Sequence, residues 1–413
     1  MMKYFLSALL ALLILLPARA QLSFSDSVRI SLLTCSAGPD AYERFGHAGI
    51  RVQDQRHRDL DITFHYGVFS FNAPHFIYRF VKGETDYQLG AIYTSDFVES
   101  YRRRGLSMQE QWLRLDSAQS QDLVNRLLIN YQPQNRTYRY SYFFDNCSTR
   151  PYNLLNLATD NSIEYDSTWT KRVTLRQMVQ EKTGVNNWLD FGIALAVAGR
   201  SDQMATVKEQ MFLPEYLMKA LSHAQIPTQI GEKTWMTPLV ESEDTLLDMR
   251  PDVAEALTAE DAFPPHTLFG ILLLIALLIS GMEYHVRGKE ERKQRGIRLL
   301  GNSYDSLMLL FVGITGCIVW FLNFFSLHPA VDHNINCFWL LPTHVIMAAL
   351  LWVKKLGNFN KVYFGITFAG IILYVVMDWI NGQYCPNVFL LILAILLLRS
   401  FMRCFELPLT NKK

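Results

Sequence analysis

Cys147 is the residue in this chain best placed to act as a nucleophile. It follows an aromatic-rich extended segment and precedes a stretch, beginning near Pro151, that is expected to be helical. Proline is tolerated in the first turn of a helix, where its missing N–H would have no partner anyway. The helix should therefore begin at about Ser148 or Thr149. The positive end of its dipole and a nearby imidazole would both favour the reactive thiolate, and N–H groups at the helix start could bind an oxyanion.

Two histidines lie on neighbouring predicted strands. The segments 46–52 and 60–68 have strand character, and the polar segment 53–59 between them suits a hairpin loop. A turn centred near Arg56 would place His47 opposite His65, whereas a shift by one residue would separate the rings. We assign His47 as the base and His65 as the group that fixes its tautomer. A histidine on a strand, a polar partner on the next strand and a cysteine at a helix start are similar to a permuted papain-type centre.

Other residues offer competing interpretations. Cys35, in the apolar predicted strand 28–36, fits a buried and inert thiol, but it is the rival nucleophile. His57 and His75 bring the histidines to four within 29 residues, yet none shows the spacing of a zinc site. We therefore expect no metal and no cofactor. The run Arg102–Arg104 suits a solvated or lipid-headgroup-facing surface.

The start of the chain predicts a secretory signal at residues 1–20. Lys3 precedes an apolar run from Phe5 to Leu16, and Ala18-Arg19-Ala20 has the form of a cleavage site. A permanent anchor would need about 20 apolar residues. Residues 21–262 mix charged and apolar residues as a globular domain does, and we expect an α+β fold there. Residues 263–413 predict an all-α transmembrane bundle.

Five spans are expected in that bundle, at about 267–284, 305–326, 335–353, 362–380 and 387–403. Lys and Arg gather in the loop 285–303, the loop 354–361 and the C-terminal tail, and they are absent from the two opposite loops. This alternation predicts a cytoplasmic C-terminus and an extracytoplasmic N-terminal domain. Arg399 in the last span is expected to reach toward a membrane surface. The net charge of +1 and the absence of an outer basic cluster argue against a nucleic-acid partner.

Cys337 and Cys385 both fall at the outer ends of predicted spans. An oxidising compartment would allow a disulfide between them if their Cα atoms lie within about 7 Å. The alternative is two separate thiols at helix ends. The polar loop 326–337 is a candidate floor beneath the active site.

Several motifs together resemble the Lnb-type family of lipoprotein N-acyltransferases, and the resemblance covers nearly the whole chain. They are Phe45–Val52, His65–Phe69, Gly83–Tyr87, Asn146–Arg150 and Met211–Leu217, with the membrane-spanning tail. The order of His and Cys is also similar to that of lecithin–retinol acyltransferase-like and permuted NlpC/P60-type enzymes.

The resemblance implies a periplasmic, permuted papain-like domain anchored in the bacterial inner membrane. It implies transfer of a fatty acyl chain from a phospholipid, through a Cys147 thioester, to the α-amino group of a diacylglyceryl-cysteine lipoprotein. His47 and Cys147 match the family pattern as base and nucleophile, whereas related domains can carry Asn at position 65. We also expect substrate contacts from residues in or beside these motifs: Asn146, Arg150, Tyr66 and Tyr87.

Two other functional classes fit the sequence. A membrane-anchored cysteine peptidase or amidase acting on cell-envelope peptides would use the same centre on soluble substrates. A non-enzymatic sensor or assembly factor would retain its function after Cys147→Ser.

Overall fold

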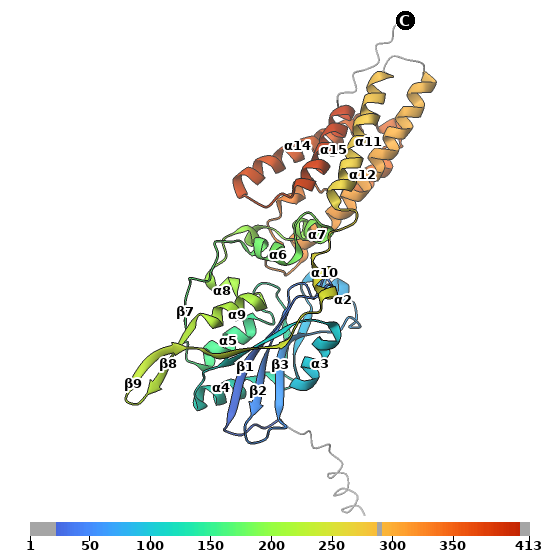
Figure 1. Cartoon of the computed structure of the whole chain (residues 1–413). Helices are drawn as coiled ribbons and strands as arrows, with labels where there is room; N and C mark the ends of the chain where they lie inside the picture. Colours follow the sequence, from blue (N-terminus) through green and yellow to red (C-terminus); the bar gives the residue numbers. More distant parts are fainter. Residues whose placement is uncertain (1–21, 287–290, 405–413) are drawn as a thin grey trace, which may run out of the picture.

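A computed structural model describes residues 22–286 and 291–404, which form a mixed α/β domain followed by a helical membrane region (Figure 1). The expected signal at residues 1–20 lies outside the described residues. The domain is built on a seven-stranded sheet in the order β10-β5-β1-β2-β3-β4-β6, and every neighbouring pair is antiparallel. Its strands are β1 (Val28–Cys35), β2 (His47–Asp54), β3 (Asp61–Val68), β4 (Asp86–Tyr93), β5 (Met108–Leu113), β6 (Thr137–Arg139) and β10 (Val240–Leu247).

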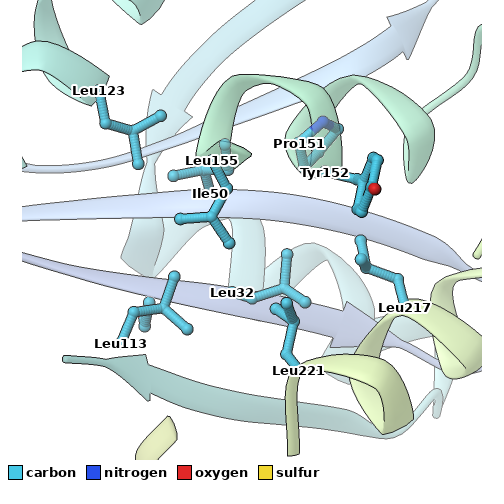
Figure 2. A pocket seen from close by; sticks show the side chains of 10 residues that line it. Leu32, Ile50, Leu113, Leu123, Pro151, Tyr152, Leu155, Leu217 and Leu221 are labelled. Atoms are coloured by element: carbon cyan, nitrogen blue, oxygen red, sulfur yellow. The ribbon is translucent and has the colours of Figure 1, made fainter. Parts of the chain in front are cut away.

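Helices cover both faces of this sheet, because successive strand side chains point to opposite faces. One face carries Leu32 and Ile50 and packs against α4 (Ser117–Tyr131), α5 (Thr149–Ala158) and α9 (Pro214–Ser222). The other carries Leu33 and Cys35 and packs against α3 (Thr94–Arg104) and α10 (Pro251–Thr258). Figure 2 shows a void of about 10 Å³ in the first core. Such a void is about the size of one water, so this core is closely packed.

The predicted strands and the predicted helix start are confirmed. β1, β2 and β3 match the expected segments, and α5 begins at Thr149. The α+β class of the domain is confirmed as well. The permuted papain-like assignment stays a prediction.

Several shorter elements complete the domain. They are α2 (Phe76–Lys82), α8 (Val207–Gln210), β7 (Glu164–Tyr165), and the hairpin of β8 (Ala224–Ile230) and β9 (Lys233–Pro238). Between the domain and the membrane helices lie α6 (Leu175–Thr183), α7 (Trp188–Ala196) and the 3₁₀ turn η1 (Gly199–Asp202) (Figure 1). Phe191 on α7 packs among Phe269, Trp339 and Phe389 of the membrane region. The two regions therefore share a hydrophobic contact.

Within the described residues, four helices are long and apolar enough to cross a membrane. These are α11 (Pro265–His285), α12 (Glu291–Phe325), α14 (Gly357–Asn381) and α15 (Asn387–Cys404). The prediction of a continuous span at 335–353 is wrong. That segment consists of η2 (Ile335–Phe338), a non-helical stretch containing Pro342, and the short helix α13 (His344–Leu350), before η3 (Lys354–Leu356). Proline lacks an N–H and disfavours helical backbone in the residue before it.

The broken segment nevertheless runs antiparallel to α12. Trp320 donates from Nε1 to the Cys337 carbonyl at 3.3 Å, and Ser306 donates from Oγ to the Ala348 carbonyl at 2.8 Å. Gly316 makes room for this approach, because a Cβ there would lie 2.6 Å from the Leu340 carbonyl oxygen. Non-helical backbone at membrane depth requires cover from protein or a lined cavity, and α12 supplies that cover on one side.

The structure corrects two further expectations for the membrane region. Arg399 does not reach a surface: it is 3% exposed and pairs with Asp305 on α12 and Glu283 on α11, because carboxylates on neighbouring helices meet its guanidinium. Cys337 and Cys385 are free thiols, so the disulfide is not formed. Both pack separately against the membrane core beneath α7.

Candidate active site

The hairpin of β2 and β3 brings the two histidine rings together. His47 Nε2 lies 3.1 Å from His65 Nδ1. The register pairs Ile50 with Phe64. Extended by one residue, this register places His65 opposite Gly49 rather than opposite His47. The predicted turn centre was therefore displaced by one residue. The rings still meet because this displacement shifts the partner by two residues, which keeps both side chains on the same face.

Gly67 creates the opening between His47 and the start of α5. The pairing of β3 with β4 shifts between Tyr66 and Val68, and Gly67 has φ +100°, which disfavours other residues. A Cβ at Gly67 would lie 3.7 Å from His47 Cε1 and 4.0 Å from Cys147 Cβ. The predicted base and nucleophile thus flank one small space, and bulges of this kind often adjoin active sites.

Asn146 holds the backbone that carries Cys147. Its Oδ1 accepts from the N–H groups of Ser148 at 2.8 Å and Thr149 at 2.9 Å, while its Nδ2 donates to the carbonyls of Tyr142 and Phe212. The side chain is 3% exposed. Its amide is thus engaged within the protein, and the expected oxyanion donors at Ser148 and Thr149 are already occupied.

Other groups lie beside the Cys147 sulfur. Against the effect of burial, the backbone N–H of Ala48, adjacent to His47 on β2, the Ser148 hydroxyl and the N–H of Cys147 itself each act to lower the pKa of the thiol. These groups are candidate donors for a charge that develops beside the sulfur.

The centre is electrically neutral at rest. Desolvation, followed by the charges of His65 and Arg104, lowers the pKa of His47 to about 3. Desolvation also lowers the pKa of His65 to about 4. Desolvation raises the pKa of the Cys147 thiol, although hydrogen bonds from Ala48 and Ser148 oppose this. Burial therefore opposes the thiolate that the helix start is expected to favour, and the thiol must lose its proton as it reacts.

The ring contact limits the useful tautomers. For His47 to accept a proton at Nδ1, its Nε2 must carry hydrogen and donate to His65 Nδ1. His65 must then carry its own proton at Nε2, next to Gly90, where a Cβ would come within 3.0 Å of that nitrogen. This tautomer pair gives His65 an orienting role.

Cys35 also lies beside His47, since the two residues pair across β1 and β2. Cys35 is 1% exposed, and burial raises the pKa of its thiol strongly. Cys147 retains partial exposure. Cys35 and the two histidine rings all lie on the α3 side of the sheet, near Phe97, so exposure rather than position separates the two thiols. Cys147 is therefore the better candidate nucleophile.

Arg104 is a residue whose role the sequence analysis missed. Its Nη1 donates to Glu43 at 2.5 Å, and its guanidinium stacks over Tyr101, 4.1 Å from the ring centre. From there its charge contributes to the low pKa of His47. Arg102 and Arg103 instead pair with Glu99 at the surface. The sequence carries one signal of this difference. The helical spacing of Arg102–Arg104 places Arg104 on a different face of the helix from its two neighbours.

The other expected substrate residues are packed inside the domain. Tyr66 is 1% exposed and accepts from Asn130 at 2.9 Å, and Tyr87 is 7% exposed and stacks on Tyr140. Arg150 forms a bidentate pair with Asp145 and lies over the Tyr138 ring. These contacts support the loop and helix around Cys147 and do not present the side chains to an open cleft.

The strand ends that carry the site face the membrane region. After β3 the chain enters α2, where the Lys82 carbonyl accepts from the Leu327 N–H at 2.8 Å. The Tyr78 ring lies 6.1 Å from the ring of Phe321 on α12. Ile77, beside Tyr78, is 77% exposed. Since α12 is a candidate membrane span, the exposed apolar residues of α2 are suited to contact with a bilayer surface.

Comparison with known families agrees with this two-part arrangement. Residues 20–181 match the Lnb N-terminal periplasmic domain, and residues 258–409 match the Lnb transmembrane domain. No curated protein and no solved structure shows significant similarity to the chain. The two matches indicate a membrane protein with a periplasmic domain. Within the described residues, no three His, Cys, Asp or Glu side chains are arranged to hold a metal ion.

Proposed function

Because this chain belongs to the Lnb-type lipoprotein N-acyltransferase family, we propose that it moves a fatty acyl chain from a phospholipid to the α-amino group of a diacylglyceryl-cysteine lipoprotein. The observation that carries the proposal is that Cys147 and His47 both border the space at Gly67, at the membrane-facing end of the domain. Both substrates are held in a bilayer, so a centre at this level can reach them.

In the first half of the reaction Cys147 attacks the phospholipid ester. His47 takes the thiol proton at Nδ1 as the C–S bond forms, and the ester C–O bond then breaks. The same proton passes to the glycerol oxygen of the departing lysophospholipid. The N–H groups of Ala48 and Cys147, which act on the pKa of the thiol, stabilise the oxyanion.

In the second half the lipoprotein amine attacks the thioester. A C–N bond forms, the C–S bond breaks, and His47 transfers a proton from the amine to the leaving thiolate. The neutral resting centre suits both steps, since His47 is available as a base and no charge is stored beside the acyl chain. Exclusion of water matters here, because hydrolysis of the thioester would turn the enzyme into a phospholipase.

Positioning roles account for the remaining predicted site residues. Asn146 fixes the backbone at Cys147, and Arg150 ties α5 to the preceding loop through Asp145. Tyr66 and Tyr87 pack behind that loop. His65 orients His47. We place the catalytic domain in the periplasm and the C-terminus in the cytoplasm.

Mass spectrometry of lipoprotein N-termini tests this function. Cells with the protein should carry N-acylated lipoproteins, and cells with Cys147→Ala should carry free α-amines at equal protein levels. Purified protein incubated with phospholipid alone should gain one acyl mass on the peptide containing Cys147. Unchanged lipoproteins together with cleavage of soluble cell-envelope peptides would instead establish the amidase alternative.

A topology experiment tests the proposed orientation. Reporters fused after residue 413 and inserted in the loop 285–303 should both read cytoplasmic. An extracytoplasmic reading at the C-terminus would mean that the broken segment or α15 does not cross.

A further inference from the structure

A large cavity lies between the periplasmic domain and the membrane helices, apart from the space around Gly67. Its volume is about 1450 Å³. Its walls come from α12, the broken segment 335–341 and α14, and residues of the turn η1 line its periplasmic end. Typical small-molecule pockets occupy about 300–1,000 Å³, so this cavity suits a bulkier ligand.

The cavity changes from apolar to polar along the membrane normal. Its deep wall on α14 includes Ile366, Ala369 and Leu373, whereas Asn381 and Gln383 lie at its outer end. From Ile366 to Asn381 the helix rises by about 22 Å, at about 1.5 Å per residue. This length exceeds half of a hydrocarbon core of about 30 Å. The deep part therefore has the depth and polarity of one lipid leaflet.

The outer rim carries charges of both signs. Arg200 and Asp202 come from η1, and Asp332 and His333 come from the loop after α12. Arg200 pairs with Glu209 while still lining the cavity. A polar, charged rim above an apolar channel matches an amphiphile whose head group lies at the membrane surface.

The roof of the cavity belongs to the same loop as the nucleophile. Phe144 lines the cavity and precedes Cys147 by three residues. Three residues span at most about 11 Å of backbone. A ligand seated beneath Phe144 is therefore within reach of the loop that presents the thiol.

We propose that this cavity binds a two-chain glycerolipid, with one acyl chain along α14 and the head group at the η1 rim. The apolar inner wall lies at membrane depth, where lipid chains are the available apolar ligand. That the bound lipid is the acyl donor rests on the function proposed above.

The test uses full-length protein with Cys147→Ala, so that binding is measured without acyl transfer. The protein is reconstituted in phosphatidylethanolamine vesicles containing a phosphatidylethanolamine with a diazirine at its acyl terminus. After illumination, labelled peptides are mapped by mass spectrometry. We expect labelling on α14 between residues 366 and 377 and on the segment 337–341.

Filling the cavity should remove this labelling. Ala369→Trp and Leu373→Trp should each lower it at least fivefold, while Ile372→Trp should leave it unchanged. Ile372 is a matched control, since it is a neighbour on α14, is 47% exposed and does not line the cavity. Thermal unfolding of each variant establishes that it is folded. Equal labelling in the Ala369 and Ile372 variants, or labelling spread evenly over all lipid-facing helices, would overturn the site.

Two further experiments distinguish a phospholipid donor from a lipoprotein acceptor as the bound lipid. An unlabelled diacylated lipopeptide that competes fully, where unlabelled phosphatidylethanolamine does not, would assign the cavity to the acceptor and overturn the donor role. In protein with Cys147 intact, Ala369→Trp should slow acylation of Cys147 by phospholipid at least tenfold. Lost labelling with unchanged acylation would also overturn the donor role, whereas labelling without any acylation in the unsubstituted protein would overturn only the proposed function.

Discussion

Two polar centres in this molecule are withdrawn from water, and they are built in opposite ways. The pair His47–His65 beside Cys147 carries no charge at rest. The cluster around Arg399 is fully ionic: its guanidinium contacts Asp305 at 2.6 Å, Glu283 at 2.9 Å and Ser280 at 2.8 Å. The first centre places a neutral imidazole near Cys147, a residue that is partly exposed. The second joins α11, α12 and α15 with its donors engaged.

The histidine centre is suited to proton transfer, whereas the arginine cluster holds helices together. A proton can move in the histidine centre, because a neutral imidazole has one ring nitrogen that can accept it. The arginine cluster cannot lose a proton or an ion-pair partner without leaving a charge unpaired at membrane depth, which is strongly unfavourable. Burial of polar groups alone therefore does not identify an active site, whereas burial with incomplete pairing points to one.

The largest expected effect comes from removing the nucleophile or its base. Cys147→Ala and His47→Ala should each lower acyl transfer by at least about a thousandfold, since the covalent step and the proton transfer are both lost. Lipoprotein N-acylation is the measurement, and the temperature of unfolding in detergent should move little. A Cys147→Ala protein that still acylates would assign the reaction to another nucleophile.

Disrupting the ionic cluster around Arg399 should lower the stability of the protein before it affects activity. Within the described residues, Arg399→Met leaves Arg403 as the only arginine paired with Asp305 and Glu283, and breaking a buried pair typically costs about 3–5 kcal/mol. We expect a clear fall in the temperature of unfolding and in the amount of protein in the membrane. The double variant with Asp305→Asn should recover part of that loss. A stable Arg399→Met protein that lacks activity would instead give the cluster a functional role.

His65 should be replaceable by a residue that accepts the same hydrogen bond. His65→Ala should slow transfer by about 10–100-fold through loss of the His47 tautomer. His65→Asn should retain most of the rate, because its side-chain oxygen can accept from His47 Nε2. The pH profile distinguishes this from mere packing, since only an orienting residue shifts the acid limb. Equal rates for the two variants would remove His65 from the mechanism.

The pH dependence follows from the low pKa values of both histidines. Because His47 titrates at about 3 and His65 at about 4, acyl transfer should not fall between about pH 7 and 5, unlike that of a base with a pKa near 6.5. Stability should behave differently. Below about pH 6.5 the unfolded chain binds protons that the folded site excludes, so stability falls as pH falls, by at most about 1.4 kcal/mol per pH unit for each histidine. Thermal unfolding between about pH 7 and 5 measures this slope, which should be shallower in His65→Asn.

Cys35 should show the smallest effect. Cys35→Ala removes a 1% exposed thiol that faces α3, so activity should change by less than about threefold and stability by about 1 kcal/mol. Its hydrogen bond with Tyr101 accounts for the stability cost. A greater loss of activity than for Cys147→Ala would mean that the nucleophile has been misassigned.

The predicted site shows where sequence patterns are sufficient. Alternation of apolar residues identified β2 and β3, and Pro151 located the start of α5, because these signals act within a few residues along the chain. The proximity of His47 and His65 required only that both side chains lie on the same face of the hairpin. It therefore held although the predicted turn was displaced by one residue. The protonation state did not follow. It depends on how much protein surrounds the rings and on Arg104, which lies far from His47 in the sequence.

The membrane region shows the same division. Hydropathy and the distribution of Lys and Arg located four helices and predicted an orientation, since both reflect the cost of placing each residue in hydrocarbon. They also assigned a continuous span to 335–353 and a membrane surface to Arg399. The folded chain breaks that span at Pro342 against α12, and it pairs Arg399 with carboxylates from two other helices. Hydropathy sums residues along one segment, whereas these outcomes depend on the neighbours that tertiary packing supplies.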